Sequence, residues 1–168
     1  MTDIPVTVLG GYLGSGKTTL LNHLLSSATE RIAVLVNDFG AINVDAALLE
    51  SADDDTISLT NGCICCSLTD GFAAALDQVR ALAARPDRLI IEASGVADPA
   101  AVAAWGHGPG FRLDGVIVLV DAEQFPRSIR NEYVGDVVAG QVRSADLVVL
   151  NKIDLAVSYT HLTLPTKA

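Results

Sequence analysis

Cysteine is scarce in this chain of 168 residues, and so is positive charge. The three cysteines all lie between positions 63 and 66, and 11 basic residues stand against 20 acidic ones, for a formal net charge of -9. Nucleic-acid backbones are bound by clustered lysine and arginine, so this balance argues against a nucleic-acid partner. A single cluster with an odd number of thiols also argues against a disulfide framework.

Long apolar runs and targeting features are lacking too. No run approaches the roughly 20 apolar residues of a membrane-spanning helix. The first residues, MTDIPVTVLGG, show no charged segment followed by a signal-type apolar stretch. We therefore expect a cytoplasmic protein with no membrane partner. In a reducing compartment, the clustered cysteines predict a metal or redox site.

The last twelve residues differ in character from the rest of the chain. VSYTHLTLPTKA, residues 157–168, has no helical or strand periodicity and resembles the translated end of a transposon-type sequencing adapter. We expect a non-native tail over 157–168 and one domain over 1–156. Half of the residues are hydrophobic, which suffices for one core.

Apolar, β-branched segments alternate with helical ones. Strands are predicted at residues 4–10, 31–37, 56–60, 88–94, 114–121 and 146–151, and helices at 17–27, 69–85, 98–106 and about 131–144. The strands are nearly continuous apolar runs, which is typical of parallel strands covered on both faces. The pattern predicts an α/β fold, a three-layer sandwich with a mostly parallel sheet that is truncated at its C-terminal end. The acidic segment 50–55 is expected to be a solvated turn.

The strongest motif lies between the first strand and the first helix. GYLGSGKT, residues 11–18, fits the phosphate-loop pattern GxxxxGK[ST]. Its glycines let backbone N–H groups surround phosphate oxygens, Lys17 would reach the β- and γ-phosphates, and the Thr18 hydroxyl would bind Mg²⁺. The candidate nucleotide-binding residues here are Gly11, Gly14, Ser15, Gly16, Lys17, Thr18 and Thr19.

A second motif predicts which base is bound. NKID, residues 151–154, follows the last apolar strand and matches NKxD. A carboxylate such as Asp154 accepts hydrogen bonds from the ring N–H and the exocyclic amine of guanine, a donor pair that adenine lacks. With Asn151 and Lys152, this residue predicts GTP rather than ATP as the nucleotide.

These segments, in this order, resemble a known family. GYLGSGKTTLLNHLL, VNDFGAINVD, NGCICC, IIEASGVADP, GVIVLVDA and NKID are similar to segments of the CobW/HypB/UreG P-loop metal-chaperone GTPases, over about residues 4–156. The resemblance implies that Glu92, at the end of a buried strand, acts near Mg²⁺ and the attacking water. It also implies that the N–H of Gly95 binds the γ-phosphate.

Three further acidic residues lie next to predicted strands or helices. Asp38 stands where the family usually has glutamate, and as a hard oxygen ligand it is a candidate for Mg²⁺ or its bound water. Asp98 and Pro99 are predicted to begin a helix as N-cap and first-turn proline. Asp121, at the end of another strand, is interpreted as structural.

The cysteines are predicted to bind a metal that is handed on. We expect Cys63, Cys65 and Cys66 in a loop between the third strand and a long helix, and thiolates suit zinc or copper(I). A structural zinc ion usually has four ligands, so three thiols fit an ion that must leave. Two of the three could suffice as ligands, and inert buried thiols or a redox switch remain alternatives.

The sequence thus predicts a GTP-hydrolysing metallochaperone that delivers zinc to a client metalloprotein. Hydrolysis would rest on Lys17, Glu92 and Asp38 with Mg²⁺. No arginine finger is evident from a motif. The candidates are Arg127, Arg130 and Arg143, an arginine of a partner, and an arginine of a second copy in a homodimer. The alternatives are an ATP-dependent kinase or ligase, and a thiol-based metal store or sensor without turnover.

Overall fold

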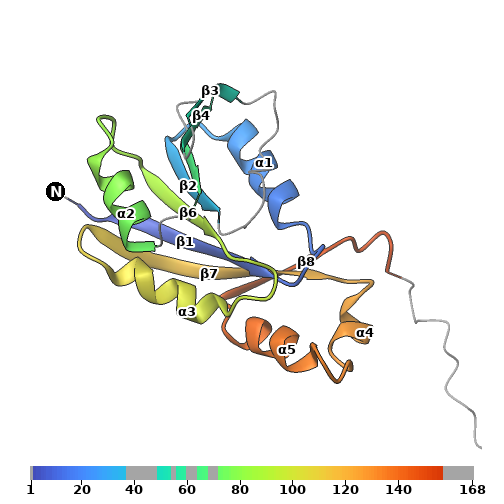
Figure 1. The fold of residues 1–168 in the computed structure, drawn as a ribbon. Coiled ribbons are helices and arrows are strands. Elements are labelled where there is room, and N and C mark those ends of the chain that lie inside the picture. Colours follow the sequence, from blue (N-terminus) through green and yellow to red (C-terminus); the bar gives the residue numbers. More distant parts are fainter. Residues whose placement is uncertain (1, 37–48, 54–55, 60–63, 68–71, 157–168) are drawn as a thin grey trace, which may run out of the picture.

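The computed structural model describes residues 2–36, 49–53, 56–59, 64–67 and 72–156, with side chains described over 2–36 and 72–156. Asp38 and Cys63 therefore lie outside the described residues. The described strands form one sheet of eight, in the order β3-β4-β5-β2-β6-β1-β7-β8 (Figure 1).

Six neighbouring strands of this sheet are parallel, and two at one edge complete it. The strands are β1 (Ile4–Gly11), β2 (Ile32–Val36), β3 (Leu49–Asp53), β4 (Thr56–Leu59), β5 (Ile64–Ser67), β6 (Arg88–Glu92), β7 (Phe111–Asp121) and β8 (Leu147–Asn151). The pairs from β5 through β2, β6, β1 and β7 to β8 are all parallel. The β3–β4 and β4–β5 pairs are antiparallel.

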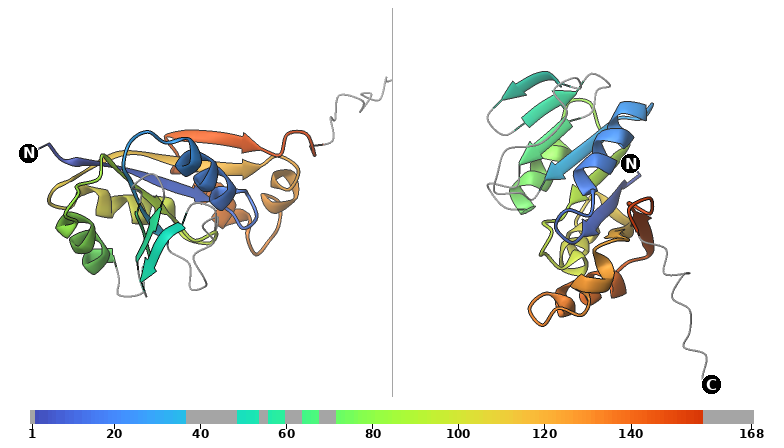
Figure 2. Two further views of the ribbon diagram at one scale, coloured as in Figure 1. Left: turned by 90° about the horizontal axis from the view of Figure 1, so that it is seen from above. Right: turned by 90° about the vertical axis from the view of Figure 1, so that its right-hand side faces the viewer.

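Helices cover both faces of the sheet. They are α1 (Lys17–Ser27), α2 (Phe72–Ala81), α3 (Pro99–Ala103), the 3-10 helix η2 (Ala104–His107), α4 (Phe125–Ser128) and α5 (Gly135–Arg143). Figures 1 and 2 show α1 on one face and α2, α3 and α5 on the other. None of the described helices combines the length and hydrophobicity that a membrane crossing requires.

Strand alternation explains the two cores of this three-layer arrangement. Side chains of successive strand residues point to opposite faces. Val8 and Ile91 accordingly belong to the cluster shared with α2 and α3, whereas Leu9 and Ile90 pack in the cluster formed with α1. The central strands are buried on both faces, which is why their sequences are continuous apolar runs. The predicted α/β sandwich is confirmed.

Two expectations about the segment after β2 are wrong. The acidic segment 50–55 was expected to be a turn, but Leu49–Asp53 forms β3. Cys65 and Cys66 were expected in a loop, but they lie within β5, where their backbones pair with Val34 and Leu35 of β2. Both strands are short and lack the long apolar run that marks the central strands, so sequence periodicity gave no signal for them.

Candidate functional site

The carboxyl ends of β1, β6, β7 and β8 meet at one edge of the sheet. Backbone register pairs Leu9 of β1 with Glu92, the last residue of β6, and pairs Asp121 with Asn151 at the ends of β7 and β8. Ligands of open α/β sheets bind outside the carboxyl ends of the strands. Four sequence-predicted segments are therefore brought together where a ligand is expected.

The turn between β1 and α1 has the backbone of a phosphate-binding loop. Gly11, Gly14 and Gly16 have φ angles of 137°, 74° and 99°, a region that side chains rarely tolerate. Helix α1 begins at Lys17, and its N-cap residue Gly16 makes no side-chain cap hydrogen bond, which is the arrangement of anion-binding helix starts. The Lys17 ammonium is buried and donates to the Gly11 carbonyl over 2.9 Å.

The first turn of α1 contacts the acid at the end of β6. The Thr18 hydroxyl donates to Glu92 Oε1 over 2.9 Å, across 74 residues of sequence. Glu92 is only 8% exposed. A hydroxyl and a carboxylate placed side by side are oxygen donors of the kind that Mg²⁺ prefers, so these two residues fit the predicted ion.

Beyond Glu92 the chain makes a turn over residues 94–97 and then enters α3. The Ala97 N–H donates to the Ser94 carbonyl over 3.0 Å. Asp98 caps α3 by accepting from the Ala100 N–H over 3.0 Å, and Pro99 follows in the first turn. The predicted helix start is thus confirmed. The turn places Gly95 directly against the phosphate loop, since a Cβ built on Gly95 would lie 2.9 Å from the Leu13 backbone nitrogen.

Two residues of the NKID motif hold the phosphate loop from the other side. The Asn151 amide donates to the Ser15 carbonyl over 2.9 Å, and the Lys152 ammonium donates to the Gly14 carbonyl over 2.8 Å. Lys152 has a φ of 56°, which is uncommon for a residue with a side chain and occurs where surrounding contacts enforce it. Asp154, the predicted guanine ligand, is exposed. Sequence reasoning assigned this motif to the base and missed its contacts with the loop.

Asp121 belongs to this network as well. Its carboxylate receives the Lys152 ammonium at 2.8 Å and the backbone N–H groups of Glu123 and Gln124 at 3.0 Å each. Burial would raise the pKa of Asp121, but the Lys152 ammonium and the two N–H groups outweigh it and hold the pKa below its usual value. Asp121 therefore remains ionised near neutral pH and fixes Lys152 over the loop.

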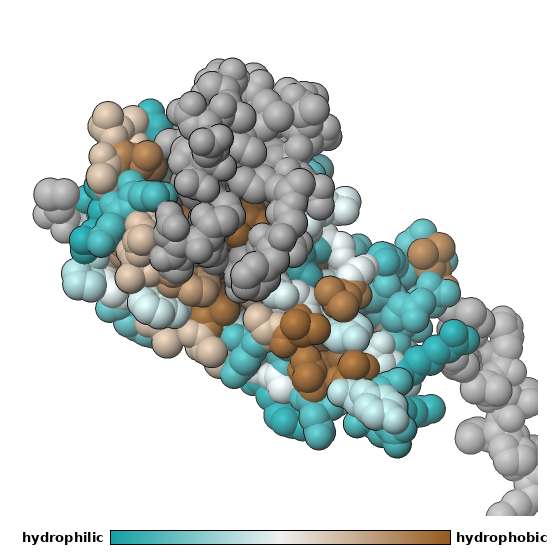
Figure 3. All heavy atoms as spheres, viewed as in Figure 1, coloured by the Kyte–Doolittle hydropathy of each residue, from teal (hydrophilic) through white to brown (hydrophobic). Residues whose placement is uncertain are grey.

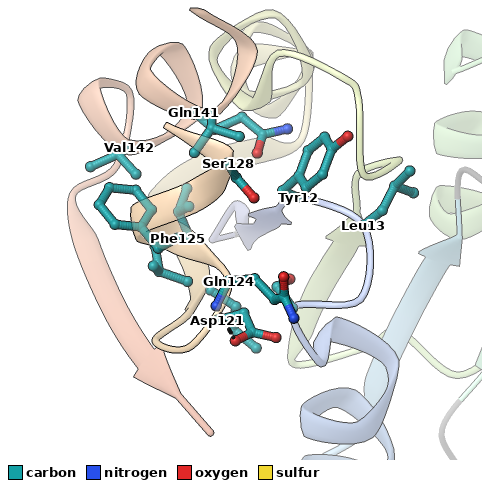
Figure 4. A pocket seen from close by; sticks show the side chains of 13 residues that line it. Tyr12, Leu13, Asp121, Gln124, Phe125, Ser128, Gln141 and Val142 are labelled. Atoms are coloured by element: carbon teal, nitrogen blue, oxygen red, sulfur yellow. Dashed lines mark hydrogen bonds between the residues drawn. The ribbon is translucent and has the colours of Figure 1, made fainter. Parts of the chain in front are cut away.

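A small cavity of about 30 Å³ lies behind the phosphate loop, between β7, α4 and α5 (Figure 4). Its walls include Tyr12 and Phe125, and the buried Ser15 hydroxyl faces it without a hydrogen bond to the described residues. A larger groove of about 490 Å³ is lined by residues 96–98 and 100 on one side and by α5 on the other. Figure 3 shows apolar side chains gathered over the region between α3 and α5, and Val96 of the turn is 58% exposed.

The side chains predicted to bind zinc are not described by the structure. Asp38 and Cys63 are not among the described residues, and for Cys65 and Cys66 the structure describes the backbone of β5. Within the residues that are described, no group of three or more His, Cys, Asp or Glu side chains could hold a metal ion. The zinc site stays a prediction from the sequence.

A glycine-rich turn with a buried lysine, a threonine–glutamate contact at the next strand end and an NKxD turn together define a P-loop nucleotide-binding domain of the α/β class. The chain belongs to the family described as "CobW/HypB/UreG, nucleotide-binding domain", whose model matches residues 5–165. The match extends past residue 156, so the predicted boundary between domain and tail stays a prediction.

Curated relatives and a solved structure agree with this assignment. The chain is 40% identical over 166 residues to "Zinc chaperone YjiA" of Escherichia coli, covering 93% of this chain and 51% of that protein. It is 36% identical over 182 residues to "Zinc chaperone CobW" of Sinorhizobium sp, covering 90% and 51%. A crystal structure of Zn(II)-bound YjiA GTPase from E. coli matches with a TM-score of 0.70 at 39% identity, covering 94% and 52%. The chain therefore spans about half the length of these relatives.

Proposed function

We propose that this chain binds GTP with Mg²⁺, hydrolyses it, and uses the nucleotide to control the holding and delivery of zinc to a client metalloprotein. The observation that carries the proposal is the 2.9 Å contact between Thr18 of the phosphate loop and Glu92 of β6. It joins the residue expected beside the phosphates to the acid expected beside the attacking water. The names of the relatives, zinc chaperones and a Zn(II)-bound GTPase, support the proposal.

Hydrolysis on this site would be a matter of positioning and charge. Loop N–H groups and Lys17 would bind the phosphate oxygens and neutralise charge as it develops. Glu92, with Asp38 as the other candidate, would orient the attacking water and accept its proton. Thr18 and Glu92 would hold Mg²⁺, which would supply further positive charge at the phosphates. Asn151 and Lys152 would keep the loop in shape, since each bonds a loop carbonyl.

Zinc is the cargo in this proposal, and its ligands would be the thiolates of Cys63, Cys65 and Cys66. Three soft ligands suit a zinc ion that is bound and later released. If GTP changes the affinity for zinc, zinc must change the affinity for GTP by the same factor. A homodimer and a cytoplasmic location remain predictions from the sequence.

A zinc titration tests the coupling. Zinc affinity is measured by competition with a chromophoric chelator in the presence of GDP and of a non-hydrolysable GTP analogue. We expect a difference of about 5- to 150-fold between the two nucleotides, the usual range of coupling between sites. Equal affinities would refute the coupling and favour a metal store that works without turnover.

Competition between nucleotides in the same samples tests the base. A 100-fold excess of ATP should leave the effect of the GTP analogue unchanged, because adenine lacks the donor pair that Asp154 would recognise. Displacement by ATP would favour the kinase or ligase alternative.

A further inference from the structure

Gln141 is a buried polar residue on the otherwise apolar inner side of α5. It is 3% exposed, and the valine one turn before it, Val138, is 4% exposed. An amide at such a position costs free energy unless its polar atoms find partners. Leucine would fill a similar volume without this cost, so the contacts of the amide are the feature to explain.

Both hydrogens of the amide are directed at the turn that follows β6. Gln141 Nε2 donates to the Gly95 carbonyl over 3.0 Å and to the Ala97 carbonyl over 2.9 Å. A primary amide nitrogen has two N–H donors, so one side chain can satisfy two carbonyls of a single turn. Gly95 and Ala97 lie 46 and 44 positions before Gln141 in the sequence.

The opposite side of the same turn lies against the phosphate loop. A Cβ built on Gly95 would lie 2.6 Å from Cδ2 of Leu13 and 2.9 Å from its backbone nitrogen, so only glycine fits there. Gly95 is therefore confined between Leu13 of the loop and Gln141 of α5. Figure 4 shows Gln141 and Tyr12, the neighbour of Leu13, at the same end of the small cavity.

We propose that Gln141 is a positioning residue, which fixes the turn 94–97 against the phosphate loop and thereby sets the preference for GTP over GDP. The inference rests on the proposed function and on the expectation, implied by the family resemblance, that the Gly95 N–H binds the γ-phosphate. A turn that is already fixed loses little conformational entropy when GTP arrives, whereas a released turn must be ordered at that moment. GDP has no γ-phosphate, so its affinity does not include this cost.

The test replaces the amide with an apolar side chain of similar size. In the purified Gln141→Leu variant, we expect the affinity for a non-hydrolysable GTP analogue to fall about tenfold, or about 1.4 kcal/mol. The affinity for GDP should stay within about twofold. Val138→Ala, which removes packing one turn away and leaves both hydrogen bonds in place, is the matched control and should keep the wild-type ratio of GTP to GDP affinity. Gln141→Met serves as the second variant if the leucine variant is unstable.

Hydrogen exchange without nucleotide provides a second readout. The Ala97 N–H, which bonds Ser94 within the turn, should exchange faster in Gln141→Leu than in Val138→Ala. Unchanged exchange, or faster exchange with an unchanged affinity ratio, overturns the inference. Equal affinities of the wild-type protein for the two nucleotides would also overturn it. The proposed function fails on a different measurement, namely equal zinc affinity of the wild-type protein with GDP and with the GTP analogue, so the two failures can be told apart.

Discussion

The nucleotide site and the strand with the cysteines belong to the same sheet, and different kinds of contact are described for the two regions. At the nucleotide site, side chains cross between elements that are distant in sequence, as in the bonds of Thr18 to Glu92 and of Asn151 to the Ser15 carbonyl, each 2.9 Å long. The strand with Cys65 and Cys66 joins the parallel part of the sheet through backbone pairing of β5 with β2. The contacts described for the first region depend on specific side chains, whereas those described for the second are backbone pairs, since side chains are described over 2–36 and 72–156.

Backbone register shows how far apart the two regions are. Ser67 of β5 pairs with Val36 of β2, Val36 pairs with Glu92 of β6, and Glu92 pairs with Leu9 of β1. Neighbouring strands are about 4.8 Å apart, so three such steps separate the cysteine strand from β1 by about 14 Å. Any influence of zinc on the nucleotide has to pass through β2 and β6 or through the segments that follow them. The comparison therefore predicts that each site can be disabled without destroying the other.

The largest effect is expected from replacing the three cysteines together by serine. Structural zinc sites contribute about 10–16 kcal/mol over four ligands, or about 2.5–4 kcal/mol per ligand, so losing three thiolates should weaken zinc binding by about 10⁵-fold or more. GTP affinity without zinc should stay within about threefold, because the phosphate loop is held by Asn151 and Lys152. Zinc binding is measured by chelator competition and GTP binding by calorimetry.

Ser67→Ala, in the same strand, is the control for this variant and should retain zinc. A large loss of GTP affinity in the cysteine variant would show that the two regions are not independent. Retention of zinc would mean that the thiols are inert.

The converse variant, Lys17→Ala, should disable the nucleotide site alone. Lys17 is the buried ammonium next to the Gly11 carbonyl, where the phosphates are expected, so its loss should slow GTP hydrolysis by about 10²- to 10³-fold. Zinc affinity of the nucleotide-free protein should not change. The assay is phosphate release at saturating GTP, with Lys167→Ala in the predicted tail as the control. Undiminished hydrolysis by Lys17→Ala would place the chemistry elsewhere.

The features that could be predicted from the sequence are those set by neighbouring residues or by a strong apolar pattern. Helix α1 was predicted at 17–27 and has these bounds, because the loop motif fixes its start and an apolar periodicity carries it onward. The cap by Asp98 and Pro99 is equally local. The strand-end position of Glu92 followed from a buried apolar run.

What the sequence missed depends on contacts between distant segments. Lys152 reaches a carbonyl 138 residues away, and Gln141 reaches one 46 residues away, and no spacing rule encodes either contact. The interpretation of Asp121 as structural agrees with its bond to Lys152, but nothing in the sequence places these two residues side by side. Such tertiary contacts need the sheet order, which apolar periodicity does not determine.

Asp121→Asn should have the smallest effect of these variants. The pH dependence of its stability tests whether Asp121 anchors the nucleotide site. The pKa of Asp121 is lowered in the folded protein, so its contribution is present above the unfolded value of about 3.9 and is lost as pH falls through the folded value. We expect the variant to lose about 1 kcal/mol of unfolding free energy at pH 7, and the difference from wild type to shrink below about pH 4. Urea denaturation at several pH values measures both.

A control for Asp121→Asn separates anchoring from general charge effects. Asp114 also has a lowered pKa, with its hydrogen bond to Arg88 as the main cause, but its side chain is 40% exposed and far along β7 from the loop. Surface ion pairs contribute little, so Asp114→Asn should change stability by less than about 0.5 kcal/mol and leave GTP affinity unaltered. Asp121→Asn should weaken GTP binding about threefold, because Lys152 loses the partner that holds it over the Gly14 carbonyl. Equal GTP affinities in the two variants would show that Asp121 stabilises its own turn without acting on the loop.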